Sequence, residues 1–433
     1  MSEKPNIIFI AIDTLRYDHL GCNGYNRNTS PNIDKWLAAN GIVMQNHFTT
    51  TSYTHPAFTS IFTGNHPLYH GVVYQKARKP LVNGIKTLPE LFKQDGYYTC
   101  GVDSLGFQDC VMHFRYGYDK LIGQDDCEPY DESIGGDDNG MNRYKPIILS
   151  MLEEAAKHQP FYFYIHIWDP HRAYLPRNIY KNMFLTGNET DKFNYSTTSK
   201  AEHPEEPKNM DYTIAQYDAS IYDCDEALGH LFQKIDSLNL DNTLTALTAD
   251  HGESLGEHNI YTRHAGIYDV SLHVPFIVRW KGKIPLGKHC DALTSHVDIA
   301  PTLLSLAGVQ HESEMAGLKL DNVLQGISQE ANDMIFGHTI NPDMRRCVRT
   351  KKYKYFKQVK GAHKEKSWPD IELYNIENDP GEQNNIADSE PEICKKLDEN
   401  LEEWIKSELN KAGHPDPMVE QSHDQIVDRL PMW

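Results

Sequence analysis

The sequence has no long hydrophobic run, because no stretch approaches the roughly 18 apolar residues that a membrane-spanning helix needs. An apolar signal-peptide core is also missing after Met1, so we expect a cytoplasmic protein without a membrane partner. Positive charge is in deficit, with 42 Lys and Arg against 61 Asp and Glu, which gives a formal charge of −19. Since nucleic acids are bound by clustered positive charge, this balance argues against a nucleic-acid partner.

Cysteine is sparse and follows no pattern. The eight cysteines include no CxxC pair and no metal-finger spacing, so we expect reduced, packed thiols. Internal repeats and low-complexity tracts are absent as well. What is present is 433 residues with 39% hydrophobic and 10% aromatic content, an ordinary globular composition with ample length for a buried core.

Continuous apolar runs alternate with helical patterns in the first 310 residues. Non-alternating β-rich runs, typical of strands covered on both faces, occupy residues 6–12, 161–167, 244–248 and 274–278. Apolar residues recur at helical spacing over 214–235, and shorter helices are predicted at 87–94 and 299–306. This order predicts an α/β domain at residues 1–310, with a mixed, mostly parallel sheet sandwiched by helices.

After residue 310 the pattern changes, and we predict a smaller C-terminal α+β domain and tail at 311–433. It includes a basic strand and turn at 345–356, which we interpret as a solvated face, and a helix at 393–409. The tail from 412 to 433 can reach a neighbouring subunit, so a homo-oligomer is left open.

Three predicted strands end in groups that can bind a metal ion, namely Asp13, then Asp169 with His171, then Asp250 with His251. In open α/β sheets ligands bind beyond the carboxyl ends of the strands, so we expect these ends to converge. Carboxylates together with imidazole suit a divalent ion such as Mn²⁺, Zn²⁺ or Mg²⁺. The alternative is that each Asp caps a helix, which is reasonable for one strand end but less so for three.

Thr54 precedes a Pro-containing helix start in a hydroxyl-rich segment. A hydroxyl at a helix N-terminus meets amide dipoles that favour an anion. Taken alone the signal is weak, because threonine before a helix is more often an N-cap.

In combination these motifs resemble those of the sulfatase branch of the alkaline phosphatase superfamily along most of the chain. The matching segments, in family order, are residues 4–7, 13–21, 63–64, 169–171, 250–258, 274–276, 298–304 and 372–375, with Asp379-Pro380 and Asn385 after them. The resemblance implies an alkaline-phosphatase-like fold and a metal-dependent hydrolase of ester bonds.

The resemblance also implies a metal site and a nucleophile. Asp13, Asp250 and His251 match metal ligands, and Thr54 matches the nucleophile that also contacts the metal. Thr14 stands where typical sulfatases have a second ligand Asp.

Three basic residues match positions that contact the substrate. His171 corresponds to a histidine that contacts substrate oxygens. Arg263 and His264 fall where the family has a basic residue, so they are expected to stabilise the transferred group or the leaving oxygen. His264 or His171 is expected to protonate the leaving group. Together with Asp169, these two histidines are also weak candidates for a second metal site.

Three departures from the sulfatase motifs bear on the chemistry. Typical sulfatases have Cys/Ser-x-Pro-x-Arg, whose first residue becomes formylglycine, whereas this chain has Thr54 and, in place of the arginine, Phe58. No formylglycine is therefore expected. The Gly-Lys-x-His signature is replaced by residues 101–104, which removes two groups that hold sulfate. Asp-Asn at the calcium site is replaced by Asp250-His251, which favours one Mn²⁺ or Zn²⁺ ion over Ca²⁺.

Because no formylglycine is expected, the predicted substrate is a phosphate or phosphonate ester and not a sulfuric ester. A formylglycine hydrate expels sulfate by collapsing to the aldehyde, and threonine lacks the second hydroxyl that this step needs. Threonine nucleophiles occur in related phosphodiesterases, and the chain also resembles phosphonate monoester hydrolases. We therefore predict hydrolysis of small anionic phosphate or phosphonate esters through a covalent threonine intermediate. The alternatives are a sulfatase without formylglycine, a phosphoryl-head-group transferase and an inactive binding protein. The loops at 123–142 and 184–210 carry no motif that identifies the leaving group.

Overall fold

The computed structural model describes residues 4–74, 81–82, 84–103, 112–123, 141–187, 210–340, 343–359 and 368–420. Most of the two loops expected to shape the substrate site, residues 124–140 and 188–209, lies outside the described residues, as do Ser104 and the end of the tail from 421 to 433.

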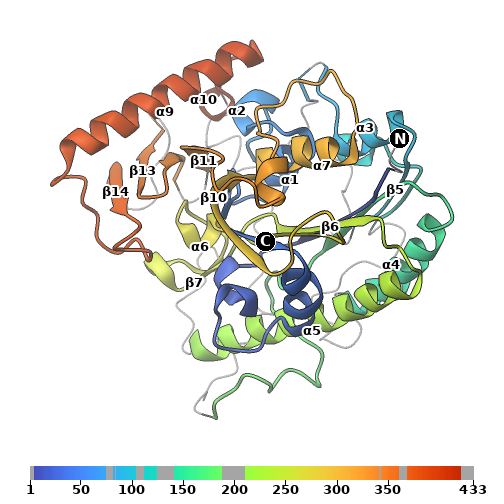
Figure 1. The fold of residues 1–433 in the computed structure, drawn as a ribbon. Coiled ribbons are helices and arrows are strands. Elements are labelled where there is room, and N and C mark those ends of the chain that lie inside the picture. The colour runs from blue at the N-terminus through green and yellow to red at the C-terminus, as the bar shows by residue number, and fades with distance from the viewer. Residues whose placement is uncertain are drawn as a thin grey trace.

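An eight-stranded sheet with the order β10-β2-β9-β6-β1-β5-β3-β4 forms the centre of the protein (Figure 1). Only β9 runs antiparallel to its neighbours, so the prediction of a mixed, mostly parallel α/β sheet is confirmed. Its strands are β1 (Asn6–Ile12), β2 (Ile42–Phe48), β3 (Tyr98–Asp103), β4 (Lys120–Ile122), β5 (Phe161–Ile167), β6 (Thr243–Ala249), β9 (Phe276–Trp280) and β10 (Lys288–Ser295).

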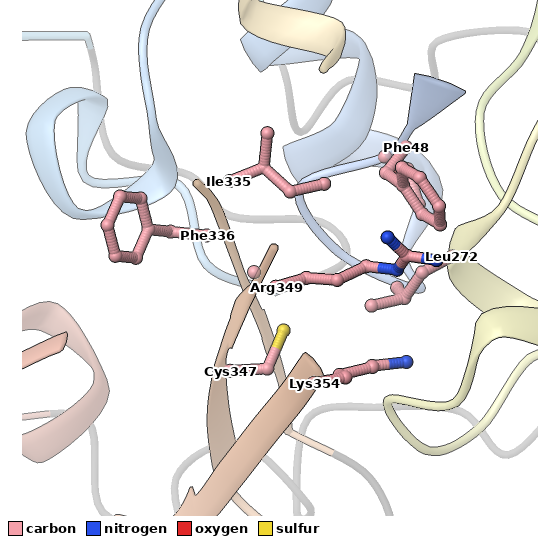
Figure 2. Close-up of a pocket in the computed structure, with 9 residues that line it drawn as sticks. Phe48, Leu272, Ile335, Phe336, Cys347, Arg349 and Lys354 are labelled. Carbon is pink, nitrogen blue, oxygen red and sulfur yellow. The ribbon is translucent and has the colours of Figure 1, made fainter. Parts of the chain in front are cut away.

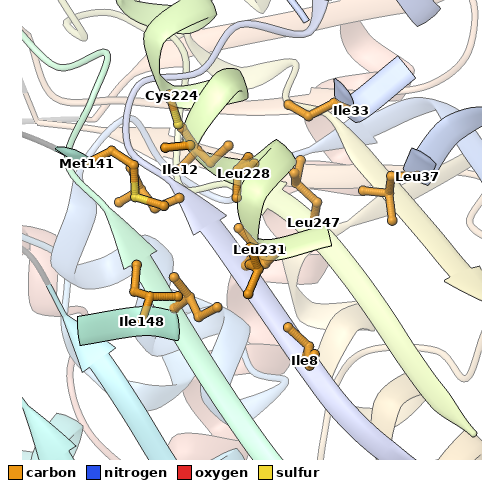
Figure 3. Packing of buried hydrophobic residues seen from close by; sticks show 14 of the residues in the cluster. Ile8, Ile12, Ile33, Leu37, Met141, Ile148, Cys224, Leu228, Leu231 and Leu247 are labelled. Atoms are coloured by element: carbon orange, nitrogen blue, oxygen red, sulfur yellow. The ribbon is translucent and has the colours of Figure 1, made fainter. Parts of the chain in front are cut away.

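Helices cover both faces of this sheet, with α4 and α5 on one side and α1, α3 and α7 on the other (Figure 1). β1 shows why its sequence lacks alternation: Ile8 and Ile12 face the first group of helices, while Phe9 faces the second, and all are buried. Figure 3 shows Leu228 and Leu231 of α5 packed over Ile8 and Ile12.

The longer helices include those predicted at 87–94, 214–235, 299–306 and 393–409 and the helix start at Thr54, whereas the helix at residues 141–155 was not predicted. Their bounds are α1 (Thr54–Thr63), α3 (Leu88–Gln94), α4 (Met141–Ala155), α5 (Met210–Ser237), α7 (Ile299–Ala307) and α9 (Pro391–Ala412). Single-turn helices are α2 (Pro67–His70), α6 (Asp269–Leu272), α8 (Asp321–Leu324) and α10 (Pro417–Glu420). The strand predicted at 274–278 instead begins at Phe276, because Pro275 has no N–H for the ladder.

A second, antiparallel sheet with the order β11-β12-β13-β14 lies towards the C-terminus, and α9 packs against it (Figure 1). Its strands are β11 (Ile335–Thr339), β12 (Arg345–Arg349), β13 (Tyr353–Gln358) and β14 (Ile371–Asn375), and a separate hairpin is formed by β7 (Ser254–Leu255) and β8 (Tyr261–Arg263). A C-terminal α+β part is therefore present. The domain boundary at 310 stays a prediction.

The prediction that residues 345–356 form a solvated face is wrong. Arg349 and Lys354 are buried, and both bind Asp269, with nitrogen–oxygen distances of 3.1 Å and 2.7 Å. Lys354 also pairs with the buried Glu382 at 2.8 Å. These acids come from distant parts of the chain, so the segment's own charge pattern could not reveal them. We call these four residues the junction network.

The junction network lies where the second sheet meets the first. Figure 2 shows Arg349 and Lys354 extending from β12 and β13 beside Phe48 of β2 and Leu272 of α6. The Arg349 guanidinium lies 4.2 Å from the centre of the Phe48 ring. Packing and ion pairing thus fix the two sheets against each other.

Two expected absences can be examined directly. The six cysteines in the described ranges are all free thiols. None of the helices in the described part of the chain combines the length and apolarity that crossing a bilayer requires.

Candidate active site

The predicted convergence of strand ends is seen at the carboxyl edge of β1 and β6. These strands are parallel neighbours, with Ile12 opposite Ala249, so the residues that follow them, Asp13 and Asp250, meet at one edge. Asp13, Asp250 and His251 each place a ligand atom within 4.8 Å of the others, and all three are fully buried. Their role as metal ligands stays a prediction.

The carboxylates of this cluster are suited to a cation and not to helix capping. Neither oxygen of Asp13 has a hydrogen-bond partner among the described residues. Asp250 Oδ1 accepts from the backbone N–H groups of Thr14 at 3.1 Å and His251 at 2.8 Å. Burial, followed by the charges of Asp250, Glu253 and Asp103, raises the pKa of Asp13 well above its usual value. A divalent ion would offset this concentration of negative charge.

His251 directs its Nε2 to the same point. Its Nδ1 lies 3.0 Å from the carbonyl oxygen of Gly252 and donates to it, so Nε2 is the nitrogen left for a metal ion. Nε2 lies 3.2 Å from Asp250 Oδ2, a distance at which both atoms could bind one cation. A Cβ at Gly252 would lie 2.1 Å from the Val270 carbonyl oxygen, so the turn that orients His251 requires glycine.

Thr54 is the first residue of α1 and is not its N-cap. The N-cap is Tyr53, which makes no side-chain capping bond, and Pro56 fits the first helical turn. The Thr54 hydroxyl instead lies 3.3 Å from His251 Nε2 and is almost completely buried. The helix therefore holds a hydroxyl against the candidate metal cluster.

Two further imidazoles extend the site. The His264 ring stacks on His251 with a centroid distance of 4.3 Å, and His171 lies 5.7 Å from His264. Burial lowers the pKa of His171 to about 3 and that of His264 well below its usual value, and the neighbouring rings lower the pKa of His264 further. Both rings are therefore neutral in the free protein. They can donate to an oxygen, but proton transfer requires a bound anion that raises their pKa.

The other predicted site residues lie further from the cluster. Arg263 ends β8, and His264 follows it directly. Asp169 accepts a 2.6 Å hydrogen bond from the N–H of Met141, the first residue of α4, so the capping alternative fits this strand end. In the part of the chain that the structure describes, only Asp13, Asp250 and His251 form a three-ligand group. The suggested second site at Asp169, His171 and His264 therefore gains no support.

Two charged residues near the site were not assigned a role from the sequence. The charge of Arg172 lowers the pKa of both His171 and His264, in addition to the effect of burial. Its place directly after Asp-Pro-His was the available signal. Glu253 belongs to the Asp-His-Gly-Glu motif, and burial raises its pKa to about 8.

Comparison with known proteins adds three findings. A family model described as Sulfatase matches residues 5–309, and one described as N-sulphoglucosamine sulphohydrolase, C-terminal, matches residues 256–407. An ulvan-active sulfatase of Formosa agariphila is 29% identical, over 94% of this chain and 81% of its own length.

Two solved structures share the fold. One, determined with its substrate D-glucosamine-2-N,6-O-disulfate, has a TM-score of 0.78 at 21% identity and covers 96% of this chain and 99% of its own. The phosphonate monoester hydrolase of Agrobacterium radiobacter has a TM-score of 0.75 at 20% identity, covering 94% of this chain and 96% of its own. At these identities the structures establish the fold alone.

Proposed function

The chain belongs to the sulfatase family, in the sulfatase branch of the alkaline phosphatase superfamily, and is a hydrolase of ester bonds; we propose that it cleaves small anionic phosphate or phosphonate esters through a covalent intermediate on Thr54. The observation that supports this proposal is the Thr54 hydroxyl, 3.3 Å from His251 Nε2 and beside the buried carboxylates of Asp13 and Asp250. A nucleophile and a set of ligands occur together where a binding protein would need neither.

Asp13, Asp250, His251 and the Thr54 hydroxyl would hold one divalent ion, and the imidazole favours Mn²⁺ or Zn²⁺ over Ca²⁺. Such an ion, when bound, supplies Lewis-acid chemistry that acidifies a hydroxyl and offsets the charge of an anionic ester. The donor set fits this role because both oxygens of Asp13 and Oδ2 of Asp250 are buried without a hydrogen-bond partner among the described residues.

The residues of the chain then act in two steps. Thr54 Oγ1 attacks phosphorus while the bond to the leaving oxygen breaks, so the phosphoryl group passes to threonine. His171, His264 and the nearby guanidinium groups hold the oxygens of the transferred group, and one histidine takes the proton of the Thr54 hydroxyl and passes it to the leaving oxygen. Water next attacks phosphorus, which releases the phosphate or phosphonate and restores the hydroxyl.

A sulfuric ester is the second candidate, because the curated relatives are named as sulfatases, including one that is ulvan-active. Against it stand Thr54 itself and Phe58, which cannot supply the guanidinium of the sulfatase motif. The metal-free protein should therefore be reconstituted with Mn²⁺, Zn²⁺ or Ca²⁺ and assayed on p-nitrophenyl sulfate, phosphate, phenylphosphonate and a bis-ester. Faster cleavage of a phosphorus ester with Mn²⁺ or Zn²⁺ supports the proposal. Faster cleavage of the sulfate overturns the proposal and supports a sulfatase instead.

Replacing Thr54 by Ala should lower turnover of the preferred ester by about 10⁴-fold or more, because it removes the nucleophile. The fold should be unchanged, since only a hydroxyl and a methyl group are lost, and circular dichroism checks this. Thr54→Ser is the matched control and should keep a substantial part of the activity. Wild-type turnover by a clean Thr54→Ala preparation would rule out the covalent route.

A further inference from the structure

A row of three buried polar side chains, from Asp103, His166 and Asp13, crosses three neighbouring strands of the large sheet. His166 on β5 is the register partner of Asp103 at the end of β3, and its Nδ1 lies 2.8 Å from Asp103 Oδ1. Its Nε2 lies 3.8 Å from Asp13 Oδ2, and the three side chains have at most 1% exposure. The backbone N–H of Asp13 is also bound to β5, through the carbonyl oxygen of Ile167 at 2.9 Å.

The orientation of the His166 ring is set from two sides. Because Nδ1 is at hydrogen-bonding distance from a carboxylate, it carries a hydrogen and the ring cannot flip without losing this bond. Phe58 packs edge-on against the ring, with a centroid distance of 4.9 Å and an interplanar angle of 78°. The Nε2 edge of His166 is thereby aimed at Asp13.

Phe58 links this row of side chains to Thr54, the proposed nucleophile. It lies in α1, one helical turn after Thr54, and is fully buried. In the sulfatase motif an arginine occupies this position, and phenylalanine offers no donor to the carboxylates. The ring nitrogen beside Asp13 comes from β5.

We propose that His166, held by Asp103 and Phe58, is a positioning residue that fixes Asp13 for metal binding. It places a ring nitrogen beside this ligand carboxylate, on a strand that neighbours β1. This inference rests on the proposed metal site of Asp13, Asp250 and His251. It concerns how the side chain of Asp13 is held in position and not which ester is cleaved.

The test is Mn²⁺ binding to the metal-free protein, measured by isothermal titration calorimetry and therefore independent of turnover. His166→Gln should weaken Mn²⁺ binding by about 10- to 100-fold, the usual effect of losing the partner of a metal ligand. Asp103→Asn, which keeps the shape but weakens the bond to Nδ1, should give a smaller loss in the same direction. It also serves as the informative variant where His166→Gln does not fold.

His47→Gln is the matched control. His47 is a fully buried histidine on β2 of the same sheet, bound to Thr294 Oγ1 at 3.0 Å, and it is not part of the Asp13 cluster. It should lose stability, as His166→Gln does, and keep the Mn²⁺ affinity of the wild type. Equal weakening by the control would overturn the inference, because loss of any buried histidine would then suffice.

Asp250→Asn separates this inference from the proposed function. Loss of Mn²⁺ binding in Asp250→Asn together with wild-type binding in folded His166→Gln and Asp103→Asn overturns the positioning role and leaves the metal site intact. Wild-type binding in Asp250→Asn shows that the metal site itself is wrong, and the inference is then overturned along with it.

Discussion

The protein contains two clusters of buried charge that differ in how the charge is compensated. In the junction network, the carboxylates of Asp269 and Glu382 are matched by Lys354, with Arg349 also bound to Asp269. At the carboxyl edge of the large sheet, Asp13 and Asp250 are equally buried, yet no lysine or arginine forms an ion pair with either in the described ranges.

The pKa values of Asp269 and Asp13 move in opposite directions as a result, whereas burial raises the pKa of Glu382 to about 7 even beside Lys354. Burial would raise the pKa of Asp269, but Arg349 and Lys354 hold it well below its usual value. Burial raises the pKa of Asp13, and the neighbouring carboxylates raise it further. Since buried charge is tolerated only with a partner, the junction network has its partners in the protein and is structural. The Asp13 cluster has no such partner among the described residues, as expected of the proposed metal site.

The largest effect on stability is expected from breaking the compensated cluster. Lys354→Met leaves Asp269 and Glu382 without the ammonium group that both contact, and should lower the free energy of unfolding by about 3–5 kcal/mol. Urea denaturation measures this. Lys351→Met is the matched control, because its pair with Asp291 is about half exposed, and should change stability by at most about 1 kcal/mol. Equal effects would mean that the junction network does not hold the sheets together.

The uncompensated cluster should respond in the opposite way. Asp13→Asn removes a buried negative charge that has no cation, so the metal-free protein should be as stable as the wild type or more stable, while activity is lost. Mn²⁺ at 100 times its Kd should stabilise the wild type by about 2.7 kcal/mol, and Asp13→Asn should lose this gain. Thermal unfolding with and without Mn²⁺ measures both effects. Severe destabilisation of metal-free Asp13→Asn would instead make this cluster structural.

The sequence was sufficient for the features that depend on local pattern. The run at 6–12 predicted a strand covered on both faces, and Ile8 and Phe9 do pack into different cores. The meeting of Asp13 with Asp250 followed from parallel strands that end at one edge. These predictions needed only the order of elements and the direction of the strands.

The features that the sequence missed depend on which strands are neighbours. The basic segment at 345–356 looked solvated because Asp269 and Glu382 are distant in sequence. Asp103 was read only as a lost family signature, since its contact with His166 requires β3 beside β5. Asp169 seemed equivalent to Asp13, but its bond to Met141 depends on where α4 begins.

Mild acid should destabilise the protein through a buried, neutral histidine of the second sheet. His338 on β11 is buried, and burial lowers its pKa to about 4. The unfolded chain takes up this proton near pH 6.5 and the folded protein does not until about pH 4, so stability falls as pH drops through this window. The loss is about 1.4 kcal/mol per pH unit for this residue, and His338→Gln should flatten the curve by that slope. His289→Gln, on an exposed part of β10, is the control, and an unaltered slope in His338→Gln would show that this histidine does not set the acid sensitivity in this pH window.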